Sequence, residues 1–291
     1  MSKLTSALKL IRPDNWVKNL LVFAALVFSK SFLNQDFVLL AVGAFFSFSF
    51  LASSVYIIND IFDREKDRKH PIKKKRPIAS GKIKIPEAIV MAVTLLFGAF
   101  AISYFIDLRL FYILGAYFVL NLLYSVKLKQ VVILDAFIVS FGFVLRVVMG
   151  AWAIEVPISS WILICTFLLA LFLAFGKRRH EVVLAEGTGK FRKVLTDYDT
   201  VFLDQMISIA SAAAVVTYSL YTIAPETVAH FGTHRLIYTS PFVLYAIYRY
   251  QYLIYKRDSG GDPTKLFLTD AGLLVAILGW VASVSLIVYL G

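Results

Sequence analysis

One polar stretch combines the residue types that bind metal ions and phosphates. It reads IINDIFDREKDRKHPIKKKRPIASG over residues 57–81, directly after a long apolar run. Its acids and one amide come first, and eight Lys and Arg lie between Arg64 and Arg76. Mg²⁺ prefers oxygen ligands, and Lys and Arg bind phosphate oxygens. The candidate metal ligands are Asn59, Asp60, Asp63 and Asp67.

The spacing of these four residues predicts one polar helix face. At about 100° per residue, the four side chains fall within an arc of about 100° and along about 12 Å of helix axis. Clustered carboxylates repel one another unless cations lie among them. The geometry supports two interpretations equally: a juxtamembrane helix whose acids pair with Lys and Arg, or a Mg²⁺ site whose neighbouring bases bind phosphates.

The pattern N-D-x-x-D-x-x-x-D at residues 59–67 resembles the first aspartate motif of the UbiA superfamily of intramembrane prenyltransferases. RPIASG at residues 76–81 is similar to the R-P-x-x-x-G continuation of that motif. The resemblance implies that the motif binds a substrate diphosphate through Mg²⁺. It implies catalytic roles for Asp60, Asp63 and Asp67, together with Lys177 from a second polar segment.

Three stretches resemble the phosphoribosyltransferase branch of this superfamily: RPDNWVKN at 12–19, NDIFDREKDRKHP at 59–71 and FGKRRHE at 175–181. The compact second aspartate motif that is typical of the family is missing from the 177–200 loop. Members of this branch transfer 5-phosphoribose from phosphoribosyl diphosphate to decaprenyl phosphate and release pyrophosphate, in the synthesis of arabinose precursors for the cell envelope. Arg and Lys clusters suit two such anionic substrates. An aromatic prenyltransferase that uses a polyprenyl diphosphate donor is the alternative.

The same resemblance and the charge pattern imply which residues bind the substrates. YSVKLK at residues 124–129 is similar to a Y-S-x-x-L-K element beside the active site of the family. Read alone, the stretch is an aromatic belt with a positive flank. The predicted binding residues are Lys18, Asn19, Asn59, Lys73, Lys75, Arg76, Tyr124, Lys127, Asp135, Arg146, Arg178, Glu181, Asp197 and Asp199.

The elements that must position these residues are membrane-spanning helices. The chain is 59% hydrophobic and 17% charged, with a mean hydropathy of +0.75. Backbone polar groups in lipid must be satisfied within a segment, so apolar runs of this length predict helices. We expect an all-α polytopic membrane protein, a single domain over residues 1–291 in a UbiA-like bundle, with a polar cavity open to the cytoplasm. The nine predicted spans are 16–33, 37–58, 87–106, 110–126, 131–153, 158–176, 201–223, 236–255 and 269–290.

The distribution of charge predicts the orientation. If the N-terminus is cytoplasmic, the cytoplasmic segments carry 25 Lys and Arg and the opposite side carries 3. By the positive-inside rule, we expect the N-terminus and the active site on the cytoplasmic side of a bacterial inner membrane, and the C-terminus outside. Because topology accounts for the net charge of +11, we expect membrane lipids and no nucleic acid as partners. The oligomeric state is left open, a homo-oligomer included.

Arg146 lies deep in the fifth predicted span, where a charge costs about 2.5–3.5 kcal/mol. Asp135 lies eleven positions earlier, within about 20° of the same helix line. Two alternatives follow: Arg146 binds a phosphate from a cavity wall, or it pairs with an acid on another span. Lys18 and Asn19 are likewise either substrate contacts or an interfacial anchor. A transporter is disfavoured, because most ionisable residues lie near the predicted span ends.

Overall fold

The computed structural model describes residues 3–70, 73–188, 197–257 and 260–290, and the regular elements in these ranges are helices. The chain forms two compact units. Unit 1 comprises residues 1–126 and 145–156, and unit 2 comprises 127–144 and 157–291. Within these ranges, six helices are long and apolar enough to cross a membrane. The prediction of an all-α membrane protein is confirmed at this level, and the single domain stays a prediction.

Unit 1 is built around one long helix, α3. It contains α1 (Lys3–Ile11), the 3₁₀ helix η1 (Pro13–Phe23), α2 (Ala24–Phe28), α3 (Gln35–Phe62), α4 (Arg64–Lys69), η2 (Lys73–Lys75), α5 (Ile85–Ile106), α6 (Leu110–Val126) and the end of α7 (Leu134–Ala153).

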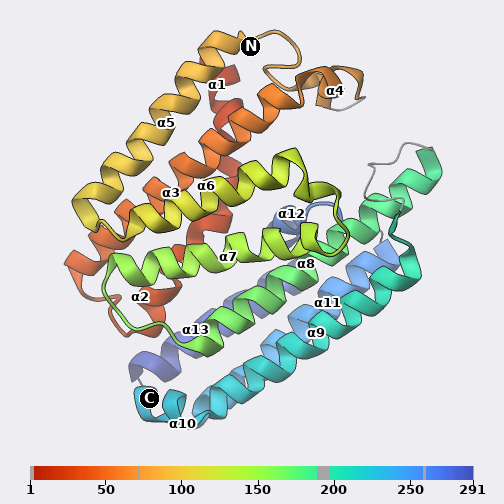
Figure 1. The fold of residues 1–291 in the computed structure, drawn as a ribbon. Helices are drawn as coiled ribbons and strands as arrows, with labels where there is room; N and C mark the ends of the chain where they lie inside the picture. Colours follow the sequence, from red (N-terminus) through yellow and green to blue (C-terminus); the bar gives the residue numbers. More distant parts are fainter. Residues whose placement is uncertain (1–2, 71–72, 189–196, 258–259, 291) are drawn as a thin grey trace. The chain divides into compact units, whose positions relative to one another are not determined.

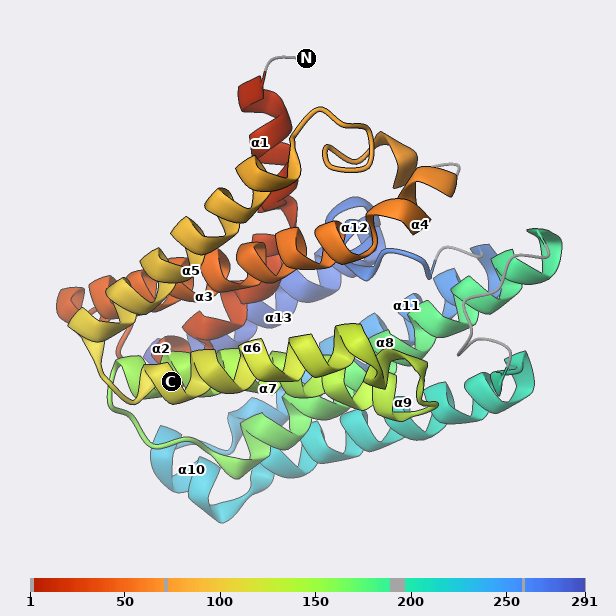
Figure 2. The ribbon, with the colours of Figure 1, turned by 45° about the horizontal axis from the view of Figure 1, so that its top comes forward.

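Helices α3 and α5 pack side by side in unit 1 (Figure 1). Small residues allow this close approach. The hydroxyl of Ser47 donates to the carbonyl of Ala99 at 2.8 Å, and that of Ser54 donates to Ala92 at 2.9 Å. Figure 2 shows the chain leaving α3, turning through α4 and returning to the start of α5. This turn carries the acidic and basic residues of the 57–81 stretch.

The first predicted span contains an eleven-residue 3₁₀ helix, η1, where an α-helix was expected. Trp16 Nε1 donates to Ser53 Oγ at 3.0 Å, and Asn19 Nδ2 donates to Ser49 Oγ at 2.8 Å. Three residues of a 3₁₀ helix and four residues of an α-helix each rise about 6 Å. The spacing of Trp16 and Asn19 along η1 therefore matches the spacing of Ser53 and Ser49 along α3. Gly150 of α7 completes the packing, because a Cβ there would lie 1.8 Å from the Val22 carbonyl oxygen.

Unit 2 contains the start of α7 and the later helices. These are η3 (Leu128–Gln130), α8 (Ser160–Thr188), α9 (Thr200–Ile223), α10 (Pro225–Phe231), η5 (Arg235–Thr239), α11 (Ser240–Arg257), α12 (Pro263–Thr269) and α13 (Ala271–Leu290).

Helices α8 and α9 run side by side and enclose the main core of unit 2 (Figure 1). Phe172 and Tyr250 are among its fully buried side chains. Helix α8 continues to Thr188, well beyond the predicted span end at residue 176. The basic residues of FGKRRHE therefore lie on a helix, where a loop was expected. Residues 189–196 of that predicted loop lie outside the described ranges.

Candidate active site

The acidic stretch forms a compact ion cluster in unit 1, with Asp60 at its centre. The Asp60 side chain is 4% exposed. Its Oδ1 accepts hydrogen bonds from Arg12 Nη2 at 2.6 Å and from Arg76 Nη1 at 2.9 Å. Arg12 is brought there by its left-handed backbone (φ 55°) at the junction of α1 and η1. It also lies over the ring of Tyr56, 5.1 Å from the centroid. Arginines are thus the partners of a predicted metal ligand.

Asp67 joins the same cluster through a shared nitrogen. Arg76 Nη1 donates to Asp67 Oδ2 at 2.7 Å, so one cationic atom lies between the carboxylates of Asp60 and Asp67. The predicted continuous helix breaks between them: α3 ends at Phe62, and Asp63 separates it from α4. Asp63 is 33% exposed and lies 3.9 Å from Lys66. Asp60 and Asp67 converge, and Asp63 lies beside them.

The donor set of this cluster fits a divalent cation of the Mg²⁺ class. Mg²⁺ is usually held by one or two carboxylates together with substrate phosphates. Two carboxylates converge on one point here, and Arg76 shows that the point attracts positive charge. Among the described residues, no group of three His, Cys, Asp or Glu side chains gathers to hold a metal without further ligands. The two convergent carboxylates match the one or two that hold Mg²⁺ beside a substrate phosphate.

Asn59 is held by the neighbouring helix α6. The hydroxyl of Ser125 donates to Asn59 Oδ1 at 2.5 Å and also to the Asn121 carbonyl at 2.7 Å. Ser125 follows Tyr124 in the YSVKLK element, so this element reaches the acidic motif within unit 1. The bond also fixes the amide oxygen that the sequence assigned to the metal.

Arg146 lies in a buried network of unit 1, with 4% of its surface exposed. Its Nε donates to Asn19 Oδ1 at 2.7 Å and its Nη2 to Tyr117 Oη at 3.3 Å. The guanidinium lies over the ring of Phe48 at 4.7 Å and over that of Tyr117 at 5.2 Å. These contacts tie η1 to α3, α6 and α7. Arg146 and Asn19 therefore have an internal structural role, and a substrate contact by either stays a prediction.

The predicted phosphate-binding lysines of unit 1 lie in more accessible places. Lys73 and Lys75 are exposed on η2. Lys18 is partly buried and donates to Asn15 Oδ1 at 3.0 Å. Exposed lysines are free to turn toward an incoming phosphate, and this suits the binding role proposed for Lys73 and Lys75.

In unit 2 the predicted residues form a second ion cluster, centred on Arg178. Arg178 Nε lies 2.8 Å from Asp135 Oδ2, an ion pair in which the N–H is not aligned with the oxygen. Arg178 also pairs with Glu181 one turn along α8. Tyr198 Oη donates to Asp135 Oδ1 at 2.8 Å. The Asp135 side chain is 0% exposed and that of Arg178 is 5% exposed, so this pair is closed to solvent, whereas Glu181 is 29% exposed.

The remaining predicted residues of unit 2 are exposed. Lys127 precedes η3, Lys177 lies on α8, and Asp197 precedes α9. Asp199 caps α9, because its side chain accepts a hydrogen bond from the Phe202 amide at 2.6 Å. This cap is a structural role that the sequence analysis did not assign.

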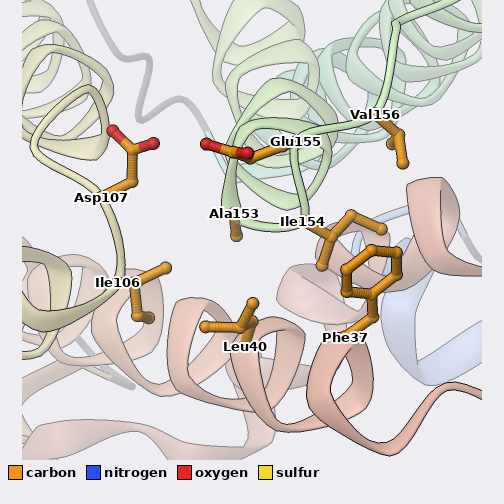
Figure 3. A pocket seen from close by; sticks show the side chains of 8 residues that line it. All are labelled: Phe37, Leu40, Ile106, Asp107, Ala153, Ile154, Glu155 and Val156. Atoms are coloured by element: carbon orange, nitrogen blue, oxygen red, sulfur yellow. The ribbon is translucent and has the colours of Figure 1, made fainter.

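A pocket of about 320 Å³ lies in unit 1 far from the acidic cluster. Leu40 of its wall is twenty residues from Asp60 on α3, or about 30 Å along the axis. Figure 3 shows the carboxylates of Asp107 and Glu155 pointing toward one another beside apolar side chains. Arg109 pairs with both acids. Both acids of the pocket are thus paired with one arginine, and the pocket lies at the opposite end of the unit from the acidic cluster.

A family model described as the UbiA prenyltransferase family matches residues 19–271. The chain belongs to the UbiA prenyltransferase family. This confirms the resemblance of N-D-x-x-D-x-x-x-D, and the matched range contains both ion clusters except for Arg12. As a UbiA member with six span-length helices, the chain is a multi-pass membrane transferase.

Two curated relatives of this UbiA chain carry the same name. Decaprenyl-phosphate phosphoribosyltransferase of Mycolicibacterium smegmatis is 35% identical, over 97% of this chain and 92% of its own length. The protein of that name from Mycobacterium tuberculosis is 36% identical, over 97% and 94%. A solved structure of a UbiA homolog from Archaeoglobus fulgidus bound to GPP and Mg²⁺ has a TM-score of 0.73 at 18% identity, and covers 97% of this chain and 99% of that one. The last likeness shows a shared fold.

Sequence reasoning missed three residues of these clusters. Arg12 opens the RPDNWVKN stretch, Ser125 lies in YSVKLK, and Tyr198 stands between the predicted Asp197 and Asp199. Each lies within a quoted stretch or between two predicted residues, and this position was the signal that could have identified it. Their partners lie 48, 66 and 63 residues away in the sequence, and local spacing does not report contacts of that range.

Proposed function

We propose that the chain transfers 5-phosphoribose from phosphoribosyl diphosphate to decaprenyl phosphate, with release of pyrophosphate. The observation that carries the proposal is the 35–36% identity to decaprenyl-phosphate phosphoribosyltransferases across nearly the whole chain. The convergence of Asp60 and Asp67 with two arginines supports it, because a diphosphate donor needs both carboxylates for a metal and cations for its oxygens.

The acidic cluster of unit 1 would bind the donor's diphosphate. Asp60 and Asp67, with Asp63 and Asn59 beside them, would hold Mg²⁺. When bound, the ion neutralises negative charge on the leaving pyrophosphate. A guanidinium carries five N–H donors, so Arg12 and Arg76 can hold a carboxylate and still offer donors to phosphate oxygens. Exposed Lys73 and Lys75 would bind the remaining phosphate charge.

The transfer itself needs little proton chemistry from the protein. The bond between the ribose C1 and the diphosphate oxygen breaks, and an oxygen of the lipid phosphate forms the new bond to C1. This nucleophile is already ionised at neutral pH, so no protein base is required. The residues act by orienting the two substrates and by balancing charge. Lys127 and Lys177 of unit 2 are the exposed cations that we assign to phosphate binding.

The finer topology is part of the same proposal. The six span-length helices, together with α6, α11 and the η1–α2 segment, would give nine crossings of a bacterial inner membrane. The Lys and Arg distribution supports a cytoplasmic N-terminus and active site and an external C-terminus. Reporter fusions at the two ends test this: an active cytoplasmic reporter at the C-terminus would contradict it.

The proposal is tested with purified protein, decaprenyl phosphate and Mg²⁺. We expect pyrophosphate release with phosphoribosyl diphosphate as donor and none with a polyprenyl diphosphate and an aromatic acceptor. The Asp63→Ala variant should lose transfer by at least about 100-fold while eluting as a folded protein, because the partly exposed Asp63 has a small packing role.

Glu65→Gln is the matched control for this variant. Glu65 lies two residues along the same stretch, is 71% exposed and pairs with Arg64 and Arg68. Its variant should retain normal turnover. Pyrophosphate release that follows the prenyl donor, or normal turnover by Asp63→Ala, would contradict the proposed function.

A further inference from the structure

Tyr198 is a buried tyrosine in an otherwise exposed segment of unit 2. It is 4% exposed, whereas its neighbours Asp197 and Asp199 are both exposed. Its ring stacks on Phe202 at 6.1 Å between centroids. Its hydroxyl makes two hydrogen bonds to the start of α7, accepting from the Ile133 amide at 2.6 Å and donating to Asp135 Oδ1 at 2.8 Å.

The first of these bonds holds a strained residue. Ile133 has φ 67°, a left-handed backbone that a β-branched side chain adopts only at a cost in energy. Its amide precedes α7, where no helical carbonyl accepts it, and the phenol oxygen takes that place. Such strain persists where surrounding contacts fix it. Tyr198 therefore helps to fix the basic turn, residues 127–133, which carries Lys127.

The second bond reaches the ion cluster of unit 2. Asp135 is fully buried, and its two oxygens face Tyr198 Oη and Arg178 Nε, each at 2.8 Å. Burial, and then the charge of Asp135, raise the pKa of the Tyr198 phenol. The hydroxyl therefore stays protonated at working pH and remains a donor to the carboxylate. Tyr198 and Arg178 together fix the orientation of Asp135.

We propose that Tyr198 is a positioning residue for the phosphoribosyl donor. Its one hydroxyl joins three segments of unit 2: the basic turn with Lys127, the α8 cluster with Arg178, and the Asp197–Asp199 segment. The donor is assigned rather than the lipid acceptor because Lys127 and Asp197 are exposed residues outside the span-length helices, where a water-soluble substrate arrives. This inference rests on the proposed function.

The test compares Tyr198→Phe with Tyr250→Phe. Tyr250 is also buried, at 1% exposed, but its hydroxyl has no hydrogen-bond partner in the described ranges. Both variants lose one oxygen from the core of unit 2, and only the first loses bonds. We expect Tyr198→Phe to raise the KM for phosphoribosyl diphosphate about tenfold, with kcat and the KM for decaprenyl phosphate within about twofold of wild type. Tyr250→Phe should match wild type in all three.

A purely structural role gives a different pattern. It would lower the amount of folded enzyme and change both KM values, or neither, and either result would overturn the proposal. Equal KM values for phosphoribosyl diphosphate in the two variants would also overturn the proposal.

Hydrogen exchange of the amides of residues 127–135 gives a readout that needs no activity. Tyr198→Phe should speed exchange there relative to wild type, and Tyr250→Phe should not. If the wild type transfers no phosphoribose, the proposed function fails, and the donor-positioning role fails with it even where exchange changes. If the wild type is active and the two variants exchange equally, the positioning role of Tyr198 is wrong, and the proposed function is unaffected.

Discussion

The two units each gather an ion cluster, but the charge at the centre of each has the opposite sign. In unit 1 a carboxylate, Asp60, is held by two arginines, Arg12 and Arg76. In unit 2 an arginine, Arg178, is held by two carboxylates, Asp135 and Glu181. The clusters also differ in which members reach solvent. In unit 1 the arginine side chains are 25% and 29% exposed and the carboxylate of Asp60 is 4% exposed. In unit 2 the arginine is 5% exposed and Asp135 is 0% exposed, whereas the carboxylate of Glu181 is 29% exposed.

The cations are thus the accessible members in unit 1, whereas the cation of unit 2 and its partner Asp135 are enclosed. Arginines that reach solvent can shift toward a substrate phosphate, and the carboxylates they leave can then take a metal ion. A buried ion pair that loses one partner leaves an uncompensated charge in the interior, so its partners stay together. We infer that the unit 1 cluster carries the chemistry and that the unit 2 cluster holds binding residues in place.

The largest effect on activity is expected from Asp60→Asn. The amide keeps the size of the side chain but removes the charge that attracts both arginines and a metal. Transfer should fall by at least about 100-fold, as seen when preorganised electrostatic groups are removed. Steady-state turnover with decaprenyl phosphate measures this. Asp36→Asn, an exposed acid in the first turn of the same helix, is the control and should retain wild-type turnover.

The largest effect on stability is expected in unit 2, from Arg178→Met. The variant leaves Asp135 buried without its cation, which costs about 3–5 kcal/mol. Replacing both residues, as Asp135→Leu with Arg178→Met, should recover most of this loss, because an apolar pair of similar volume is often neutral. Thermal unfolding in detergent compares the three proteins. A double variant as unstable as the single one would show that the pair itself stabilises the unit.

The smallest effect concerns a pair outside both clusters. Hydrogen bonds from Arg109 lower the pKa of Asp107 beyond the end of α5. A carboxylate with a lowered pKa stabilises the folded protein above its unfolded-state pKa, near about 3.9, and the contribution is lost as pH falls through the folded-state value. Asp107→Asn should therefore flatten the acid side of the stability curve by about 1 kcal/mol or less. An unchanged slope of unfolding temperature between roughly pH 3 and 5 would refute this.

The sequence predicted the helical class, the membrane character and the family, because apolar run length and a spaced acidic motif are local properties. It also placed Asp60 and Asp67 on a common face, and both do meet Arg76. It did not predict the helix break at Asp63, which depends on the backbone turning there (φ −88°, ψ 4°). Nor did it predict that arginines would be the partners of the acids, because Arg12 arrives from 48 residues away.

Arg146 illustrates the same limit in the interior. The sequence offered a phosphate or an acid on another span as its partner. The structure shows Asn19, Tyr117 and Phe48 in contact with it, and the two alternatives stay predictions. Aromatic faces and amide oxygens can stabilise a buried guanidinium, and neither carries a formal charge that a search for ion pairs would find. Hydropathy patterns therefore identify a buried cation but not the neutral groups that contact it.

The equal spacing of the hydrogen-bonding residues on η1 and α3 limits how the length of η1 can change. Trp16 and Asn19 are three residues apart, and their partners Ser53 and Ser49 are four apart. A single inserted or deleted residue in η1 would rotate every later side chain by about 120° and remove Asn19 from Arg146. A change of three residues restores the phase. Functional chains descended from this one should therefore gain or lose residues in η1 in multiples of three.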